Sequence, residues 1–128
     1  MLGIRTLHHV SLSVTDLDRA KRFYGEVLGL EEIARPDFDF PGAWYAVGDR
    51  QLHLIAHTAP RSLRGATEVD PRDGHFALRV ASHRRALEHL KASAVPLVDS
   101  PLNATPWAQI HIADPDGNLI ELNAERSD

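Results

Sequence analysis

Four side chains have the types and positions expected of ligands to a divalent metal ion: His9, His53, His75 and Glu121. Three imidazoles and one carboxylate suit zinc, nickel, iron or manganese, whereas calcium prefers a set of oxygen ligands. Such ions often take six ligands, so four protein groups leave positions open for water and substrate. An open position is typical of a catalytic metal rather than a structural one. The sequence therefore predicts one divalent metal ion per site.

The four candidate ligands lie in segments where apolar and other residues alternate, as in strands with one buried face. These segments are 7–14, 51–56, 74–80 and 118–124. Successive side chains of a strand point to opposite faces, so each ligand points away from its apolar neighbours. Among the other histidines, His8 alternates with the core residues, and His83 and His89 lie on a predicted helix. His57 points to the same face as His53 but lies where the strand runs into a linker, and His111 is expected to face the cavity without binding the metal.

The two halves of the chain repeat one another. Residues 9–14 align with residues 75–80, an offset of 66 positions, and Ala20 aligns with Ala86 at the same offset. His53 aligns with Glu121 at an offset of 68. An internal duplication predicts an approximate two-fold axis between the halves, near which equivalent groups can converge. The candidate ligands occupy such equivalent positions.

Each half is predicted to have the order strand, helix and three strands. In the first half, Thr15 is the expected helix N-cap and Gly29 the expected stop. Strands are then expected at 31–35, 43–47 and 51–56, and the last two are joined by a turn at 48–50. The second half is predicted to contain a helix at 82–93 and strands at 95–98, 107–113 and 118–124, with a type I turn at 114–117. The fold is thus predicted to be α+β, a single domain over 1–128 whose modules span about 1–57 and 74–124, joined by a polar linker at 58–73.

Composition favours a folded protein that acts on small molecules. Apolar residues make up 43% of the chain, which is typical of a packed core. There is no cysteine, which excludes disulfides and thiolate ligands. The net charge of −4 does not suggest a nucleic-acid surface. No apolar stretch is long enough to cross a membrane and the N-terminus does not look like a signal peptide, so we expect a cytoplasmic location.

Several stretches resemble the vicinal oxygen chelate superfamily, which includes glyoxalase I, bleomycin-resistance proteins and extradiol dioxygenases. They are HHVSLSV followed by TDLDRAKRFYGEVLGLEE, then QLHLI, GHFALRV and DPDGNLIEL. The resemblance implies two tandem βαβββ modules that form a curved mixed-sheet cup around a metal ion, commonly in a homodimer. The family's metal positions fall on His9, His53, His75 and Glu121, as the alternation of the strands also predicts.

The favoured function is a metal-dependent isomerase or lyase of the glyoxalase type. Its small substrate would carry adjacent oxygen atoms, with the metal ion acting as a Lewis acid. Glu121 is the only carboxylate of the four and is the best candidate base. His111 is expected to point to the same face of its strand as Trp107 and Gln109, and it is a second candidate catalytic residue. Four aromatic residues either line the cup and favour a partly apolar substrate or belong to ordinary core and loop packing: Phe38, Phe40, Trp44 and Trp107.

Two alternatives stay open at this point. One is an iron-dependent extradiol-type dioxygenase, in which His111 stands at the position of the family's tyrosine. The other is a non-catalytic protein that binds a small molecule, like the bleomycin-resistance proteins. The length of the linker at 58–73 also suggests that a homodimer builds each site from modules of two chains, an exchange with closed two-fold symmetry.

Overall fold

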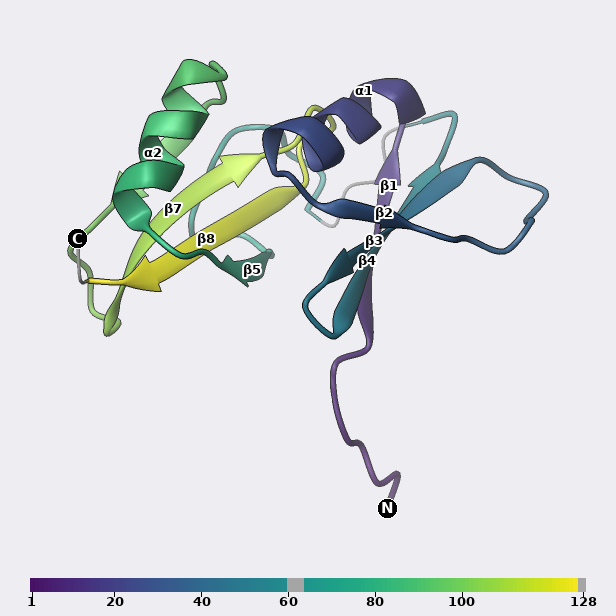
Figure 1. The fold of residues 1–128 in the computed structure, drawn as a ribbon, viewed down its shortest axis with the longest axis horizontal. Coiled ribbons are helices and arrows are strands. Elements are labelled where there is room, and N and C mark those ends of the chain that lie inside the picture. Colours follow the sequence, from purple (N-terminus) through teal and green to yellow (C-terminus); the bar gives the residue numbers. More distant parts are fainter. Residues whose placement is uncertain (60–63, 127–128) are drawn as a thin grey trace. The chain divides into compact units, whose positions relative to one another are not determined.

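The structure, a computed structural model, describes residues 1–59 and 64–126. The chain divides into two compact units, Met1–Pro60 and Arg61–Asp128, and each contains one four-stranded sheet and one helical segment (Figure 1). The predicted α+β fold with a repeated βαβββ order is confirmed. Part of the predicted linker, residues 60–63, lies outside the described residues, and the assignment of 1–128 to a single domain stays a prediction.

The first unit has the order strand, helix and three strands. It consists of β1 (His9–Val14), α1 (Leu17–Lys21) running into the π-helix η1 (Arg22–Val27), β2 (Glu31–Ile33), β3 (Gly42–Val47) and β4 (Arg50–Ala56). The sheet order is β1-β4-β3-β2, with β1 parallel to β4 and the other neighbours antiparallel. The parallel pair is possible because α1 and η1 supply the crossover that a parallel connection needs.

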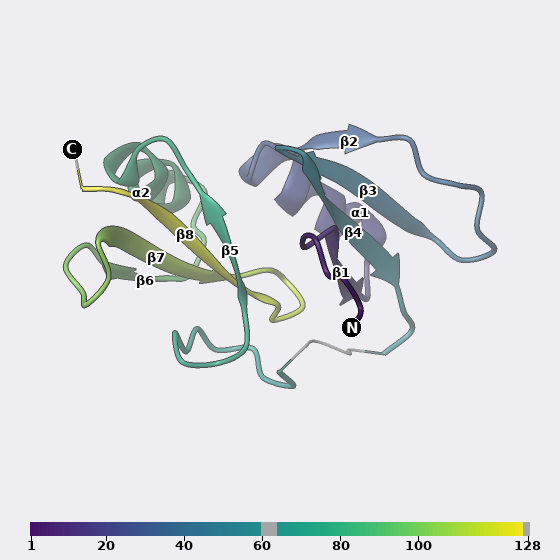
Figure 2. The same cartoon turned by 90° about the horizontal axis from the view of Figure 1, so that it is seen from below.

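The second unit repeats this topology. It consists of β5 (Phe76–Arg79), α2 (His83–Ala92), β6 (Leu97–Ser100), β7 (Trp107–Ala113) and β8 (Leu119–Glu125). The sheet order is β5-β8-β7-β6, and Figure 2 shows β5 alongside β8, with which it pairs in parallel. The register is repeated too, since Ser11 lies opposite His53 and Ala77 lies opposite Glu121. The duplication inferred from the sequence therefore extends to individual strand pairs.

Each helical segment packs against one face of the sheet in its own unit. The apolar residues of the strands are buried on that face, and the main ones are Leu12, Val14, Tyr45, Leu52, Leu54, Ile110, Ile112, Ile120 and Leu122. His53 lies between buried leucines, and Glu121 lies between Ile120 and Leu122. Because neighbours in a strand point to opposite faces, both ligand candidates lie on the face that the helix does not cover.

The first helix differs from its prediction in two ways. Its N-cap is Asp16, not Thr15, because the Asp16 carboxylate accepts a hydrogen bond from the backbone N–H of Arg19 at 3.0 Å. The segment from Arg22 is a π-helix rather than a continuation of the α-helix, as the bond from Leu28 N to Phe23 O shows. The wider turn places the adjacent rings of Phe23 and Tyr24 in the core together.

The turn between β7 and β8 forms as predicted, with a bond of 3.0 Å from the Gly117 N–H to the Asp114 carbonyl. Gly117 has a φ of +85°, which disfavours other residues. A Cβ atom at this position would also lie only 2.5 Å from the carbonyl oxygen of Ala66 and 3.0 Å from Thr67. The described part of the linker is thus packed directly onto this turn.

This contact predicts that substitution by alanine lowers the unfolding free energy more at Gly117 than at Gly48, the glycine of another turn. Gly48 also has a positive φ, +57°, but no atom lies within 4 Å of its added Cβ. Gly48→Ala should therefore cost about 1–2 kcal/mol of unfolding free energy. Gly117→Ala should cost at least about 3 kcal/mol, because steric overlap adds to the backbone strain. Urea denaturation measures both, and equal losses would show that the linker does not press on the turn.

Candidate metal centre

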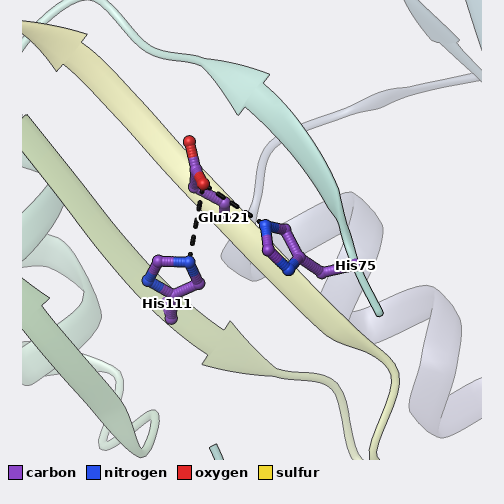
Figure 3. A group of neighbouring side chains, drawn as sticks. All are labelled: His75, His111 and Glu121. Carbon is purple, nitrogen blue, oxygen red and sulfur yellow. Dashed lines mark hydrogen bonds and ion pairs between the residues drawn. The ribbon is translucent and has the colours of Figure 1, made fainter. Parts of the chain in front are cut away.

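Three strands of the second unit bring two imidazoles to one carboxylate. His75 directly precedes β5, His111 lies in β7 and Glu121 lies in β8. The register pairs His111 with Glu121 across the antiparallel strands. Figure 3 shows both rings pointing toward the Glu121 carboxylate. Their contacts join one oxygen, Glu121 Oε1, to His75 Nε2 at 3.3 Å and to His111 Nε2 at 3.5 Å.

The second nitrogen of His75 determines the proton position on its ring. His75 Nδ1 lies 2.7 Å from the backbone carbonyl oxygen of Asp73, which can only accept a hydrogen bond. Nδ1 therefore carries a proton, and a neutral His75 presents a lone pair at Nε2. That lone pair faces an oxygen of Glu121 that is also an acceptor when the carboxylate is ionised. The contact is attractive only when a proton or a metal cation lies between the two atoms.

His111 is held differently. It is 3% exposed, and its Nδ1 has no hydrogen-bond partner among the described residues. A neutral ring in this position is best satisfied with its proton on Nε2, from which it can donate to Glu121. Burial lowers the pKa of His111, and the nearby His75 lowers it further, while Glu121 acts in the opposite direction without reversing the shift. His111 is therefore neutral at pH 7.

Glu121 is buried and is held by two amide side chains. Asn123 donates to Glu121 Oε2 at 2.7 Å, and Gln109 donates to Glu121 Oε1 at 3.3 Å. Asn123 is itself fixed by Arg79, whose Nε donates to the Asn123 side-chain oxygen at 2.6 Å. The Arg79 guanidinium in turn lies over the ring of Trp107, 5.4 Å from its centroid. These contacts fix the orientation of the carboxylate before any ligand binds.

The same contacts determine the charge of Glu121. Burial alone would raise the pKa of its carboxyl group, because it disfavours the ionised form. The hydrogen bond from Asn123, the contact with His75 and the charge that either imidazole carries when it is protonated outweigh burial, so the pKa of Glu121 lies below its ordinary value. Glu121 is thus an anion at neutral pH.

The three residues fit a divalent metal ion, provided that His111 carries its proton on Nδ1 when its Nε2 acts as a ligand. Their donor atoms all lie within 4.8 Å of one another. Adjacent ligands around an ion with bonds of about 2.1 Å stand about 3.0–3.4 Å apart, close to the two contact distances of Glu121. A histidine ligand normally donates its other N–H to a carbonyl or carboxylate, as His75 does to Asp73. Two imidazoles with one carboxylate suit manganese, iron, nickel or zinc.

The other two predicted ligands lie in the first unit, where they form a stack of rings. His9 stacks on His53 with 4.1 Å between centroids, and Trp44 stacks on His53 with 4.0 Å. Trp44 pairs with His53 in the same register in which His111 pairs with Glu121. His53 Nε2 also contacts the Gln51 side-chain oxygen at 2.8 Å. Burial lowers the pKa of His53, and the positive charges of His9, His8 and Arg35 add to this effect.

Contrary to the prediction from the alternation of its strand, His8 does not point into the core. It precedes β1 and is exposed rather than in the core, and its Nδ1 lies 2.8 Å from His9 Nδ1. The predicted aromatic residues of this unit lie next to the stack: the ring of Phe38 is tilted against Trp44, with 6.3 Å between centroids, and stacks on Phe40, with 5.1 Å between centroids. The Arg35 guanidinium lies over both phenylalanine rings.

The structure thus brings together two of the four predicted ligands, His75 and Glu121, and adds the second predicted catalytic residue, His111. It also brings together His9 and His53, so the four-ligand site stays a prediction. The supporting roles of Asn123 and Gln109 were not predicted. Each lies two positions from a site residue on the same strand, Asn123 after Glu121 and Gln109 before His111, and therefore points to the same face. Arg79 and the Asp73 carbonyl gave no signal in the sequence.

The family model described as the Glyoxalase/Bleomycin resistance protein/Dioxygenase superfamily matches residues 6–122. The chain belongs to this superfamily. Its relatives include Glyoxylase I 4 from Arabidopsis thaliana, which is 29% identical over 94% of this chain and 71% of its own length. A probable chloroplastic lactoylglutathione lyase from the same plant is 26% identical over 92% of this chain. The chain spans only 35% of the length of that lyase.

Solved structures of this superfamily share the fold. One is a mutant of the fosfomycin resistance protein FosX from Listeria monocytogenes, complexed with Mn(II) and 1S,2S-dihydroxypropylphosphonic acid. It is 21% identical, has a TM-score of 0.76, and covers 95% of this chain and 93% of its own. Glutathione transferase FosA from Serratia marcescens is among the sequence relatives and is 28% identical over 94% of this chain and 81% of its own length. The superfamily thus contains a metal-binding structure with the same architecture as this chain.

The geometry predicts which histidines control metal affinity. His75→Ala and Glu121→Ala should each weaken Mn(II) binding by more than about 100-fold, since even groups that only support metal ligands contribute 10–100-fold. His89→Ala, on the exposed part of α2, should leave binding unchanged. Binding should weaken below about pH 6, because protons compete for imidazole nitrogens.

Isothermal titration with Mn(II) measures these affinities. The variants His9→Ala and His53→Ala, titrated in the same way, test the other half of the predicted quartet. Equal affinities of the His75 and His89 variants would show that the cluster in the second unit does not hold the metal.

Proposed function

We propose that this protein is a divalent-metal-dependent isomerase or lyase of the glyoxalase type that acts on a small substrate with adjacent oxygen atoms. The observation that carries the proposal is the contact of His75 Nε2 with Glu121 Oε1, since His75 Nδ1 is committed to the Asp73 carbonyl. Two lone pairs that face one another require a proton or a metal cation between them, and a divalent ion bound there would meet this requirement while His75 stays neutral. Membership of a superfamily that includes an Mn(II)-binding relative supports the same conclusion.

In this proposal His75 and Glu121 hold the ion, and His9 and His53 are retained as further ligands predicted from the sequence. When bound, a divalent ion acts as a Lewis acid that stabilises negative charge developing on a substrate oxygen. Manganese, iron, nickel and zinc all suit the ligand types. The lowered pKa of Glu121 keeps it ionised, which favours its role as a ligand.

His111 is the group best suited to move a proton. It is buried beside Glu121, neutral at pH 7, and has one ring nitrogen without a partner among the described residues. A neutral imidazole can accept a proton from a substrate carbon and return it to a neighbouring carbon. Glu121, the base favoured from the sequence, is a weaker base than an imidazole because its pKa is lowered. We therefore propose His111 as the proton carrier and Glu121 as a ligand.

The relatives suggest which substrates to test first. Their names include lactoylglutathione lyases and fosfomycin resistance proteins, and the ligand in the Listeria structure carries hydroxyls on neighbouring carbons. Glutathione hemithioacetals and fosfomycin are therefore the first substrates to test. The aromatic residues Phe38, Phe40 and Trp44 remain proposed contacts for an apolar part of the substrate.

The proposal predicts that His111 and His75 affect different steps. His111→Gln should lower kcat by about 10²–10⁴, the usual contribution of a general acid or base, with a smaller change in Mn(II) affinity. His75→Gln should lose the metal and activity together. Turnover in deuterium oxide without oxygen should place deuterium in the product. Steady-state kinetics, metal titration and mass spectrometry measure these effects, and unchanged kcat in the His111 variant would contradict the assignment.

One observation also supports the iron-dependent dioxygenase as a second candidate. His75, His111 and Glu121 are two histidines and one carboxylate, the ligand set of many non-haem iron oxygenases. In that case His111 would itself be a ligand, so His111→Gln would lose the metal. Turnover would require iron and oxygen, whereas binding of a small molecule without turnover would favour the non-catalytic alternative.

The assembly and location of the protein are also proposals. A homodimer is common in the superfamily and fits the sequence-based hypothesis, and light scattering of the purified protein measures it directly. No helix in the described parts of the chain, 1–59 and 64–126, has the length and hydropathy required to span a bilayer. A cytoplasmic location remains our expectation from the sequence.

A further inference from the structure

The guanidinium of Arg64 is buried although it belongs to the polar linker. Its side chain is only 1% exposed. Burying a charged group is costly unless that group is paired and its donors are satisfied, so such a residue needs a compensating network. Nothing in the sequence distinguishes Arg64 from the arginines at exposed positions.

Arg64 has such a network, and all of it lies in the second unit. Its Nε donates to the Gly117 carbonyl in the β7–β8 turn at 2.9 Å. Its Nη1 pairs with the Asp73 carboxylate at 3.1 Å, and its Nη2 donates to the Glu68 carbonyl. One side chain therefore joins two points of the linker region to the β7–β8 turn, which lies 53 residues further along the chain.

These points include the support of a proposed metal ligand. The side chain of Asp73 binds Arg64, and its backbone carbonyl accepts the hydrogen bond from His75 Nδ1 at 2.7 Å. Because this carbonyl holds the ring proton on Nδ1, the lone pair of a neutral His75 lies on Nε2, the atom that faces Glu121. The close contact of Gly117 with Ala66 and Thr67 shows independently that the linker is seated on the same turn.

We infer that Arg64 is a positioning residue: by clamping the linker to the β7–β8 turn, it holds the Asp73 carbonyl that sets the tautomer and orientation of His75. The inference rests on the proposed function insofar as His75 is a metal ligand. It adds a residue of the linker, distant from Glu121 in sequence, to those that determine metal affinity. A purely structural role of Arg64 would change stability without changing the state of the His75 ring.

Nitrogen NMR of the imidazoles tests the inference on the metal-free protein. At a pH where His75 is neutral, the wild type should show its proton on Nδ1. Arg64→Met keeps much of the side-chain volume but removes all three contacts, so His75 should become a mixture of both tautomers. Asp73→Asn disturbs the ion pair with the smallest change of shape and serves as a second variant if Arg64→Met does not fold.

The same variants are then titrated with Mn(II). Arg64→Met should bind it about 10–100-fold more weakly, the usual effect of losing a group that supports a ligand. Leu90→Ala, a change of a buried core residue in α2 of the same unit, is the matched control and should retain both the tautomer and the affinity.

A folded Arg64→Met variant, or Asp73→Asn in its place, with an unchanged His75 tautomer and unchanged affinity would overturn the inference. If the wild type bound no Mn(II) or other divalent ion, the proposed function would fail. The tautomer of His75 would then still decide whether Arg64 positions the ring.

Discussion

The buried carboxylate of Glu121 determines how the second unit is organised. An ionised carboxylate on a sheet face is stable out of water only if each oxygen has partners. Asn123 satisfies one oxygen, while Gln109, His111 and His75 converge on the other. These partners lie in β8 itself, in the neighbouring β7 and directly before the neighbouring β5, so the position of the carboxylate depends on the register of these strands. The polar face is therefore built around one anion.

The sheet topology explains how such a face arises. The order β5-β8-β7-β6 places β8 between a parallel and an antiparallel neighbour, so residues from β7 and from the start of β5 flank Glu121. The first unit has the same topology and register, but its equivalent positions hold a stack of three rings, His9, His53 and Trp44. One backbone arrangement thus supports a cluster around a buried anion in one module and a stack of aromatic rings in the other.

Much of this arrangement could be predicted from the sequence, because it follows from local rules. Strand alternation placed Glu121 and His53 opposite the apolar core, and the repeat predicted equivalent positions for them. The rules failed where tertiary contacts decide. The π-helix η1, in which Phe23 and Tyr24 are both buried, was not indicated by the apolar spacing, and the partner of Arg64 at Gly117 lies 53 residues away. A polar linker carries no periodic pattern, so its packing against the turn left no trace in the sequence.

The orientation of the His75 ring also depends on a contact that the sequence does not reveal. Its proton position depends on a backbone carbonyl, and every residue has one, so no residue type marks it. Residue types identified His75 as a candidate ligand, while the structure shows which of its nitrogens faces Glu121. The distinction matters because only the nitrogen with a lone pair can bind a metal ion.

The central claim, that a metal ion binds between His75 and Glu121, is tested most directly by electron paramagnetic resonance of the protein loaded with Mn(II). The wild type should bind one ion per chain and show coupling of its electron spin to an imidazole nitrogen. Selective loss of one such coupling in His75→Ala, with loss of tight binding in Glu121→Ala, is the predicted result. Tight binding and an unchanged spectrum in both variants would contradict the account.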